Sequence, residues 1–536
     1  MPSICRPLAL WLLLLLPSAA MAGDGADLGA RIAAQGTPDG VAPCTSCHMP
    51  DGAGMAAAGF PRIAGMNADY MARQLRDFAS GKRQNPTMMP LAKALTAAEI
   101  VAVVDYYAGL PVPPVATEAA GSAGTEAAAE LARGGDWSKR SLPACAQCHG
   151  SGGNGIGAAF PGIAGQHASY IKAQLLAWRA GSRANDPLGM MQTVAVALSE
   201  AEIDALAAYY AAQPARPPAG AAMGTSAATA GTEVSAEEIH SGPLPRHDAP
   251  PAAREVDERG HFEPPLPSAI PDDRFGATVR QGLDIFENTN AHPASAKFVG
   301  NEQACGNCHI DAGRLADSAP LWAAWVAYPA YRTKNDKVNT YIERVQGCFK
   351  YSMNAQASAA GAPPAADSDT IVSLVAYSYW LATGAPTGDH RMPGRGYPRL
   401  KEAAEKPDAG RGKALYAQQC AICHGGEGQG VLDSDGVTLF PPLWGAAAYN
   451  WGAGMHRVDT AAAFIRHNMP LGLGDTLTEQ EAWDLAQFIN SHERPQDPRF
   501  AGDLEETARE FHSNPFSLYG KPGLDGSLLG SKPSAK

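Results

Sequence analysis

The sequence predicts an all-α fold made of four small domains in tandem, and two observations lead to this prediction. The first is a cysteine motif, C-x-x-C-H, that occurs four times along the 536 residues. The second is an internal repeat in the N-terminal half, in which each copy has the pattern of helices placed around one motif. Helical units this small need a bound group to complete their cores.

The C-x-x-C-H motif is the attachment signature of a c-type haem, whose porphyrin edge is bonded by the two thiols while the histidine reaches the iron. Zinc would need four ligands, whereas each copy offers three, and thioredoxin-like pairs do not repeat four times with histidine always next. We therefore expect four covalently bound haem c groups. The attaching cysteines are Cys44, Cys47, Cys145, Cys148, Cys305, Cys308, Cys420 and Cys423, and the histidines are His48, His149, His309 and His424.

The expected architecture is four cytochrome c-type haem domains in tandem, arranged as two dihaem modules joined by a Pro/Ala-rich linker. Such a linker raises the effective concentration of the modules without fixing one geometry. The expected boundaries are 23–113 and 125–213 for domains one and two, 214–270 for the linker, 271–395 and 396–500 for domains three and four, and 501–536 for a polar tail that wraps the fold or extends from it.

Residues 1–22 have the features of a cleaved secretory signal peptide, with Arg6, an apolar run from Leu8 to Leu16 and an A-x-A site before Gly23. Cys5 would leave with it. No later stretch approaches the about 18 apolar residues of a spanning helix, so we expect a periplasmic protein without a membrane span. The formal net charge of −12 argues against a nucleic-acid partner.

Residues 44–110 and 145–213 are the two copies of the repeat. Each should contain a middle helix (Tyr70–Ser80 or Tyr170–Ala180), a loop with methionines and a final helix. Thr96 and Ser199 are the expected N-caps of the final helices, because each has a glutamate at the third helical position.

This half resembles the tandem dihaem cytochrome c family, an electron-transfer group with His/Met haems, through a G-R-x-N…M…L-[ST]-x-x-[DE]-I pattern. Counting back from Leu95 and Leu198 places Met88 and Met191 in register as sixth iron ligands. The neighbouring Met89 and Met190 remain alternatives.

In domain three a helix from about Phe275 to Asn288 should lead to the motif, and a second should lie near Val338–Gln346. Cys348 is the cysteine of the mature chain that lies outside the motifs. It could be an iron ligand, a nucleophile or both, or a small buried hydrophobic residue. Arg344 would lie one helical turn away, although Gly347 leaves the continuation of the helix open. Met353 is the other possible iron ligand.

Five basic residues lie between Pro329 and Tyr351, against two acidic ones, which reverses the charge of an otherwise acidic chain. They form either a solvated face or an anion site beside Cys348. These residues are Arg332, Lys334, Lys337, Arg344 and Lys350.

Domain four should contain helices at Gly412–Gln419 and Thr478–His492. Met469, in an N-M-P sequence, is the expected sixth ligand of its haem, with Met455 and His467 as alternatives.

The stretch from GNEQACGNCH to YSMN, together with FPPLWG, NWGAGMH and ERPQDPRF, resembles periplasmic dihaem thiosulfate dehydrogenase. The whole chain resembles a fusion of that enzyme behind its dihaem electron-acceptor cytochrome. The resemblance implies a His309/Cys348 haem and a His424/Met469 haem. Some members have a lysine beside this methionine that exchanges with it on reduction. This chain has Asn468 at that position, so the resemblance does not imply ligand exchange here.

The resemblance implies that two thiosulfates are joined into tetrathionate through an adduct on Cys348. Arg332, Lys334 and Arg344 would offset the repulsion between the dianions, and Ser352 would donate a hydrogen bond. Electrons would pass through domain four to the N-terminal module, and then to a cytochrome c, a high-potential iron–sulfur protein or an oxidase. The alternatives are a pure electron carrier and an enzyme that works mainly as a tetrathionate reductase.

Overall fold

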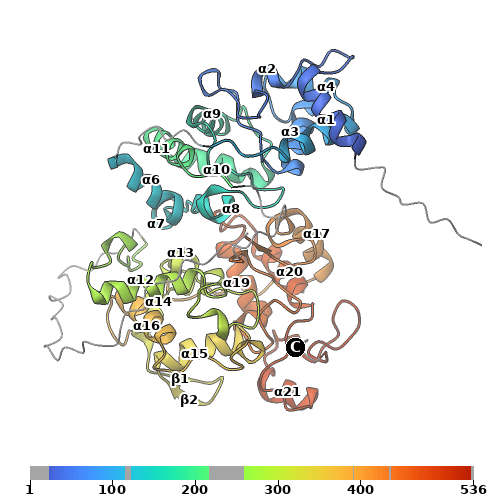
Figure 1. The fold of residues 1–536 in the computed structure, drawn as a ribbon. Helices are drawn as coiled ribbons and strands as arrows, with labels where there is room; N and C mark the ends of the chain where they lie inside the picture. The colour runs from blue at the N-terminus through green and yellow to red at the C-terminus, as the bar shows by residue number, and fades with distance from the viewer. Residues whose placement is uncertain are drawn as a thin grey trace, which may run out of the picture.

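A computed structural model describes residues 23–114, 122–216, 257, 259–389, 391–433 and 436–532. Within these ranges the chain is almost entirely helical, and its strands form two short antiparallel hairpins. The elements up to α11 form an upper module and those from α12 onward a lower one (Figure 1). The expected signal peptide and most of the expected linker, residues 217–256, lie outside the described residues.

The N-terminal module contains the two copies of the repeat, and the predicted middle and final helices are present in both. The side chains of Thr96 and Ser199 each accept a hydrogen bond from the backbone N–H of the glutamate at the third helical position. The glutamate side chain in turn accepts one from the backbone N–H of the N-cap residue, which completes a capping box. The methionines expected in loops instead open short helices, α4 and α10. The helices are α1 (Gly23–Gln35), α2 (Thr45–His48), α3 (Ala68–Ser80), α4 (Met88–Ala94), α5 (Ala97–Ala108), α6 (Ser122–Gly134), α7 (Trp137–Arg140), α8 (Cys145–His149), α9 (Ala168–Arg179), α10 (Met190–Ala197) and α11 (Glu200–Ala211), with 3₁₀ turns η1 (Ala56–Ala58), η2 (Ser151–Gly153) and η3 (Pro187–Gly189).

The C-terminal module starts before residue 271, because Phe262 from the expected linker is buried against Trp322 at a ring distance of 5.3 Å. Its elements are η4 (Pro267–Ala269), α12 (Arg274–Glu287), η5 (Ala296–Phe298), η6 (Cys305–Asn307), α13 (Ile310–Gly313), α14 (Leu321–Ala327), β1 (Ala330–Arg332), β2 (Lys337–Asn339), α15 (Tyr341–Tyr351), η7 (Ala355–Ala357), α16 (Asp369–Leu381), α17 (Ala409–Gln419), α18 (Ala421–His424), β3 (Val431–Leu432), β4 (Thr438–Phe440), η8 (Gly454–His456), α19 (Val458–Asn468), α20 (Glu479–Asn490) and α21 (Leu504–Phe511).

The helix that carries Cys348 differs from its prediction. The hairpin of β1 and β2 occupies the start of the predicted segment, and α15 begins only after Thr340, whose side chain forms a capping box with Glu343. The helix then continues through Gly347 to Tyr351. Arg344 and Cys348 therefore lie on one helical face.

The tail is folded where it is described. Helix α21 is capped by Asp503, and the residues after it return to domain four, where Tyr519 and Leu529 pack against the buried Trp451. The tail therefore wraps the domain.

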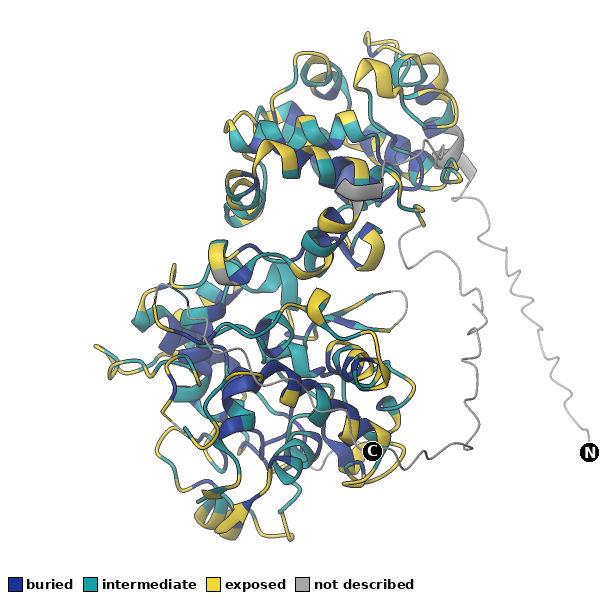
Figure 2. Cartoon of the chain, turned by 90° about the vertical axis from the view of Figure 1, so that its left-hand side faces the viewer, coloured by how far each residue is buried: buried dark blue, intermediate teal, exposed yellow. Residues whose placement is uncertain are grey.

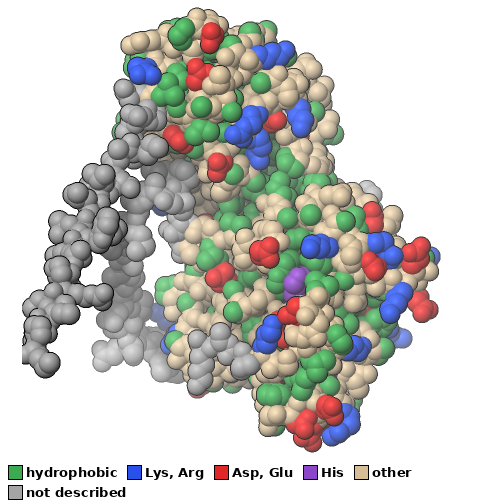
Figure 3. Space-filling model, turned by 90° about the vertical axis from the view of Figure 1, so that its right-hand side faces the viewer, with side chains coloured by type: hydrophobic (Ala, Val, Ile, Leu, Met, Phe, Trp, Pro, Cys, Tyr) green, Lys and Arg blue, Asp and Glu red, His purple; other side chains and the backbone are tan. Residues whose placement is uncertain are grey.

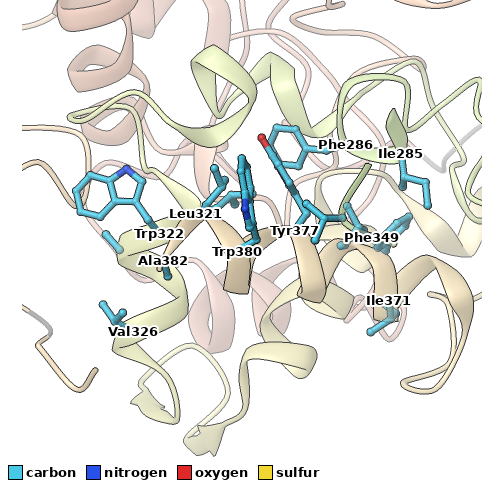
Figure 4. Close-up of a cluster of buried hydrophobic side chains, with 14 of the residues drawn as sticks. Ile285, Phe286, Leu321, Trp322, Val326, Phe349, Ile371, Tyr377, Trp380 and Ala382 are labelled. Atoms are coloured by element: carbon cyan, nitrogen blue, oxygen red, sulfur yellow. The ribbon is translucent and has the colours of Figure 1, made fainter. Parts of the chain in front are cut away.

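Domain three has the largest core, formed mainly by α12, α14, α15 and α16 (Figure 4). Trp322, Phe349, Ile371 and Tyr377 are almost completely buried in it.

Buried residues gather inside each module and exposed ones line the outside (Figure 2). Acidic and basic side chains are mixed over the lower part of the face in Figure 3. Among the described residues, no helix has both the length and the apolar character needed to cross a membrane.

Candidate functional site

Each of the four motif histidines is oriented by one backbone carbonyl. In every case Nδ1 donates to the carbonyl oxygen, so Nε2 is the nitrogen that can bind iron, as in orienting contacts of metal-bound histidines. The motif cysteines are free thiols, as haem attachment requires. The donor set therefore fits four haem c groups. The carbonyls are those of Pro61 for His48 at 3.0 Å, Pro161 for His149 at 2.8 Å, Ala319 for His309 at 2.6 Å and Pro441 for His424 at 2.9 Å.

The haem sites of domains one and two share one continuous cavity, lined by both motifs. Met88 lines it, and Met89 is not among the lining residues. In domain two both Met190 and Met191 line it, but Met191 packs in the cluster that contains Cys145, whereas Met190 packs toward domain four.

The third motif opens onto a separate cavity between α12, α15 and the motif loop. Cys305, Cys308, His309 and Cys348 line it, so the extra cysteine lies in the haem site of its own domain. The side chains of His309 and Cys348 are close enough to form a hydrogen bond. Arg344, Ser352 and Met353 also line this cavity, and so does Met455, which was expected as an alternative ligand in domain four.

Cys348 is prepared to act as a thiolate. Burial raises the pKa of its thiol, but the positive charge of Arg344, the hydrogen bond with His309 and the charge of Arg332 outweigh this and lower the pKa to about 6. Arg344 donates from Nη1 to the sulfur at 2.8 Å. The motif thiols behave differently, since burial raises the pKa of Cys305 and of Cys308 to about 12.

Arg344 and Arg332 lie near enough to Cys348 for their charges to act on its thiol, and Lys334 lies beside these two arginines. Burial, followed by repulsion from Arg499, Arg344 and Arg332, lowers the pKa of Lys334 to about 7. Lys334 donates to the carbonyl of Gly452 and lies 3.6 Å from the ring centre of Tyr351.

Lys337 does not join this group, because it pairs with Glu343 on the exposed side of α15. The ammonium of Lys350 lies 5.5 Å from the centre of the Tyr351 ring, farther from it than the ammonium of Lys334.

Tyr351 and Arg499 lie near Lys334 and were not among the residues predicted from the sequence. The Arg499 guanidinium lies 5.3 Å from the Tyr351 ring and is held by two hydrogen bonds to the carboxylate of Asp497. The ERPQDPRF segment, which carries the resemblance, contains Arg499 and was the available signal.

In domain four, Met469 follows α19 and packs in the cluster that contains Cys420. His467 instead pairs with Asp475 at 2.8 Å. Asn468 is buried and accepts a hydrogen bond at 2.8 Å from the hydroxyl of Ser318 in domain three, so it ties the two domains together.

The modules are joined by direct packing, which corrects the expectation that a tether leaves their geometry open. Trp137 of domain two is buried with Ile310 of domain three and Phe464 of domain four. The rings of Phe160 and Phe440 meet at 5.3 Å, beside Cys148 and Cys423. The second and fourth motifs are therefore neighbours, and α8 lies at the junction in Figure 1.

Family models match three of the four domains. Residues 29–110 and 139–212 match the model described as cytochrome c. Residues 407–489 match the model described as cytochrome c oxidase, cbb3-type, subunit III.

Several known proteins are similar to this chain. A thiosulfate dehydrogenase of Stutzerimonas stutzeri is 53% identical over 272 residues, which cover 50% of this chain and 85% of the relative. A thiosulfate dehydrogenase electron acceptor of the same organism is 46% identical over 212 residues, 39% of this chain and 96% of the relative. The solved structure of thiosulfate dehydrogenase (TsdBA) from Marichromatium purpuratum, as isolated, has a TM-score of 0.83 and 48% identity, and the match covers 95% of this chain and 100% of that one.

Proposed function

The chain belongs to the thiosulfate dehydrogenase family, and on that premise we propose that it joins two thiosulfate ions into tetrathionate at Cys348. It is a thiosulfate-oxidising enzyme with covalently bound haem c, and it unites an electron-acceptor part with a dehydrogenase part in one chain. One observation carries the proposal: Cys348 shares a cavity with His309, and Arg344 holds its sulfur at 2.8 Å.

The reaction we propose uses the Cys348 sulfur as a covalent carrier. A bond forms between Sγ and the terminal sulfur of one thiosulfate, and two electrons leave the sulfur pair. A second thiosulfate attacks the sulfur contributed by the first, the bond to Cys348 breaks, and tetrathionate leaves while the thiolate is restored. The haems, when bound, accept the two electrons one at a time.

The basic residues have a defined task in this scheme. Two dianions and a thiolate must approach each other, which in a site of low dielectric constant costs several kcal/mol without compensation. Arg344 and Arg332 supply positive charge beside the sulfur, and Lys334 adds a further charge next to these arginines when it is protonated. Ser352 would donate a hydrogen bond to a substrate oxygen.

We assign the iron ligands from the same contacts. Bound to iron, the Cys348 thiolate would lower the potential of its haem, whereas a methionine ligand would raise it, so electrons would tend to leave the site in domain three. The proposed pairs are His309 with Cys348, His424 with Met469, His48 with Met88 and His149 with Met191.

The packing of the domains supports a route for the electrons. Domain three contacts domain four around Phe464, and domain four contacts domain two through Phe440 and Phe160. The shared cavity then leads from the second motif to the first. We propose that the enzyme works in the periplasm after removal of residues 1–22 and delivers electrons to a cytochrome c, a high-potential iron–sulfur protein or an oxidase.

The test replaces Cys348 with alanine and with methionine. Both variants should keep four attached haems, since attachment uses the motif thiols, and both should lose thiosulfate oxidation. In low-temperature electron paramagnetic resonance, the oxidised protein should show the compressed g-spread of a thiolate-ligated haem, and each variant should lose it. Met353→Leu is the matched control in the same cavity and should keep signal and turnover.

The two Cys348 variants separate ligation from covalent catalysis, because methionine can bind iron but cannot carry the adduct. Near-native turnover of Cys348→Met would remove the covalent step. Near-native turnover of Cys348→Ala would remove the enzymatic role of this site.

A further inference from the structure

Domains one, two and four carry the same small element beside the haem motif. After the motif the chain turns back, and a phenylalanine directly before the histidine-binding proline pairs with an earlier apolar residue through the backbone. We call this element, with the second motif cysteine, the haem rim. Its members are Cys47, Met55 and Phe60 in domain one, Cys148, Ile156 and Phe160 in domain two, and Cys423, Val431 and Phe440 in domain four.

Two of these haem rims cover each other. Ile156, Phe160 and Phe440 form one buried cluster with Cys148, Cys423 and Val431 packed around it. The exposed fractions of Ile156, Phe160 and Phe440 are 6%, 7% and 5%. In the one contact between haem rims that the described residues show, the haem rim therefore packs against the equivalent element of another cytochrome c-type domain, and the contact is apolar.

The haem rim of domain one has no such cover among the described residues. Met55 is 38% exposed where its counterpart Ile156 is 6% exposed, and Met49 beside it is 37% exposed. Asp51 is the single charged residue between Met49 and Pro61. Domain two contacts the backbone of this loop through two side chains, since Ser169 donates to the carbonyl of Ala56 and His167 to that of Ala53.

The uncovered haem rim also borders the cavity of the first haem. Cys47, Ala58, Gly59 and Phe60 line that cavity, and Ala58 and Gly59 are exposed at the surface. In Figure 1 helix α2, which carries this motif, lies at the end of the N-terminal module away from the C-terminal one. An apolar, nearly uncharged surface thus lies at the far end of the electron route.

We propose that the haem rim of domain one is the docking site for a separate c-type cytochrome, which presents its own apolar haem rim as domain four does to domain two. This inference rests on the proposed function, because it names the acceptor of the same electrons. Each encounter transfers one electron and reduces one ferric acceptor, so each tetrathionate formed requires two encounters.

The test measures binding of oxidised mitochondrial cytochrome c, used as the probe, to the oxidised holoprotein by surface plasmon resonance, without thiosulfate. Met55→Lys and Ala57→Lys each place an unpaired charge in the docking site and should weaken binding by about tenfold or more. Val101→Lys is the matched control, since Val101 is 48% exposed on α5 of the same domain. It adds the same charge and should leave binding unchanged.

The rate of probe reduction by thiosulfate should follow the same order. Equal effects of all three substitutions would overturn the docking site, because they would report overall charge. A dimer of the unmodified protein that Met55→Lys dissociates would also overturn it, because the surface would then belong to a second copy. If thiosulfate reduced no haem in the unmodified protein, the proposed function would fail separately from the binding result.

Discussion

Lys334 makes the charge of the proposed active site depend on pH. Its pKa is lowered to about 7 by burial and by the neighbouring arginines, so it is neutral above that value and positive below it. Since anions bind the charged form better, the half-saturating thiosulfate concentration should fall as the pH is lowered from about 8 to about 6.

Steady-state kinetics across this range would test the sign. Lys334→Gln should flatten the dependence and hold the half-saturating concentration near its high-pH value. Lys337→Gln is the control, because Lys337 pairs with Glu343 on the exposed side of the helix and should leave the dependence intact. A pH dependence that survives in Lys334→Gln would assign it to another group.

The sequence could predict the site residues that are close together along the chain. If residues 344–348 are helical, their four-residue spacing places Arg344 beside Cys348, and the third C-x-x-C-H motif identifies His309. Arg499 could not be predicted from spacing, because it reaches Tyr351 from the end of domain four through the tertiary fold. The separation of Lys337 from Lys334 also depends on the hairpin, which turns one lysine inward and the other outward.

At the scale of elements, helices with strong local signals were predicted well and the start of α15 was not. The capping sequence Thr340 to Glu343 was available and marks the true start. The preceding hairpin, residues 330–339, alternates polar and apolar residues over only three positions per strand, too few for a period to be recognised. Gly347 suggested an end, but tertiary packing of Phe349 and Tyr341 carries the helix past it.

Gly347 therefore lowers the stability of α15 without being needed for a turn. It has no positive φ angle, and an added Cβ would meet no atom within 4 Å. Gly347→Ala should raise the free energy of unfolding by about 0.5–1 kcal/mol, because glycine loses more backbone freedom in a helix. Thermal unfolding followed by far-ultraviolet circular dichroism measures this. Gly313→Ala is the contrasting variant and should destabilise, since Gly313 has a φ angle of 79° and a Cβ added there would lie 2.6 Å from the Leu321 side chain.

At the scale of the whole molecule, the fold class and the four haem motifs followed from the sequence, but the relation between the modules did not. A Pro/Ala-rich segment predicts a tether and says nothing about what its ends bind. The junction between the modules is formed instead by residues that are part of the structure of one domain and also pack against another domain. Ile156 and Phe160 belong to the haem rim of domain two and are buried, whereas Met55, the repeat counterpart of Ile156 in domain one, is left exposed. Because both copies of the repeat carry a haem rim, the sequence does not indicate which of the two is covered by another domain.

That difference between the copies supplies a matched test of the proposed electron route. Phe160 and Phe60 hold the same place in the repeat and both line the N-terminal cavity, but Phe160 also packs against Phe440 of domain four. Removing a buried phenylalanine ring costs about 3–5 kcal/mol of packing, so Phe160→Ala should loosen the contact between domains two and four. Stopped-flow reduction by thiosulfate should then show the C-terminal haems reduced at the unmodified rate and the N-terminal haems reduced more slowly. Phe60→Ala removes the same ring from domain one and should leave transfer into domain two unchanged, so equal slowing in both variants would place the route elsewhere.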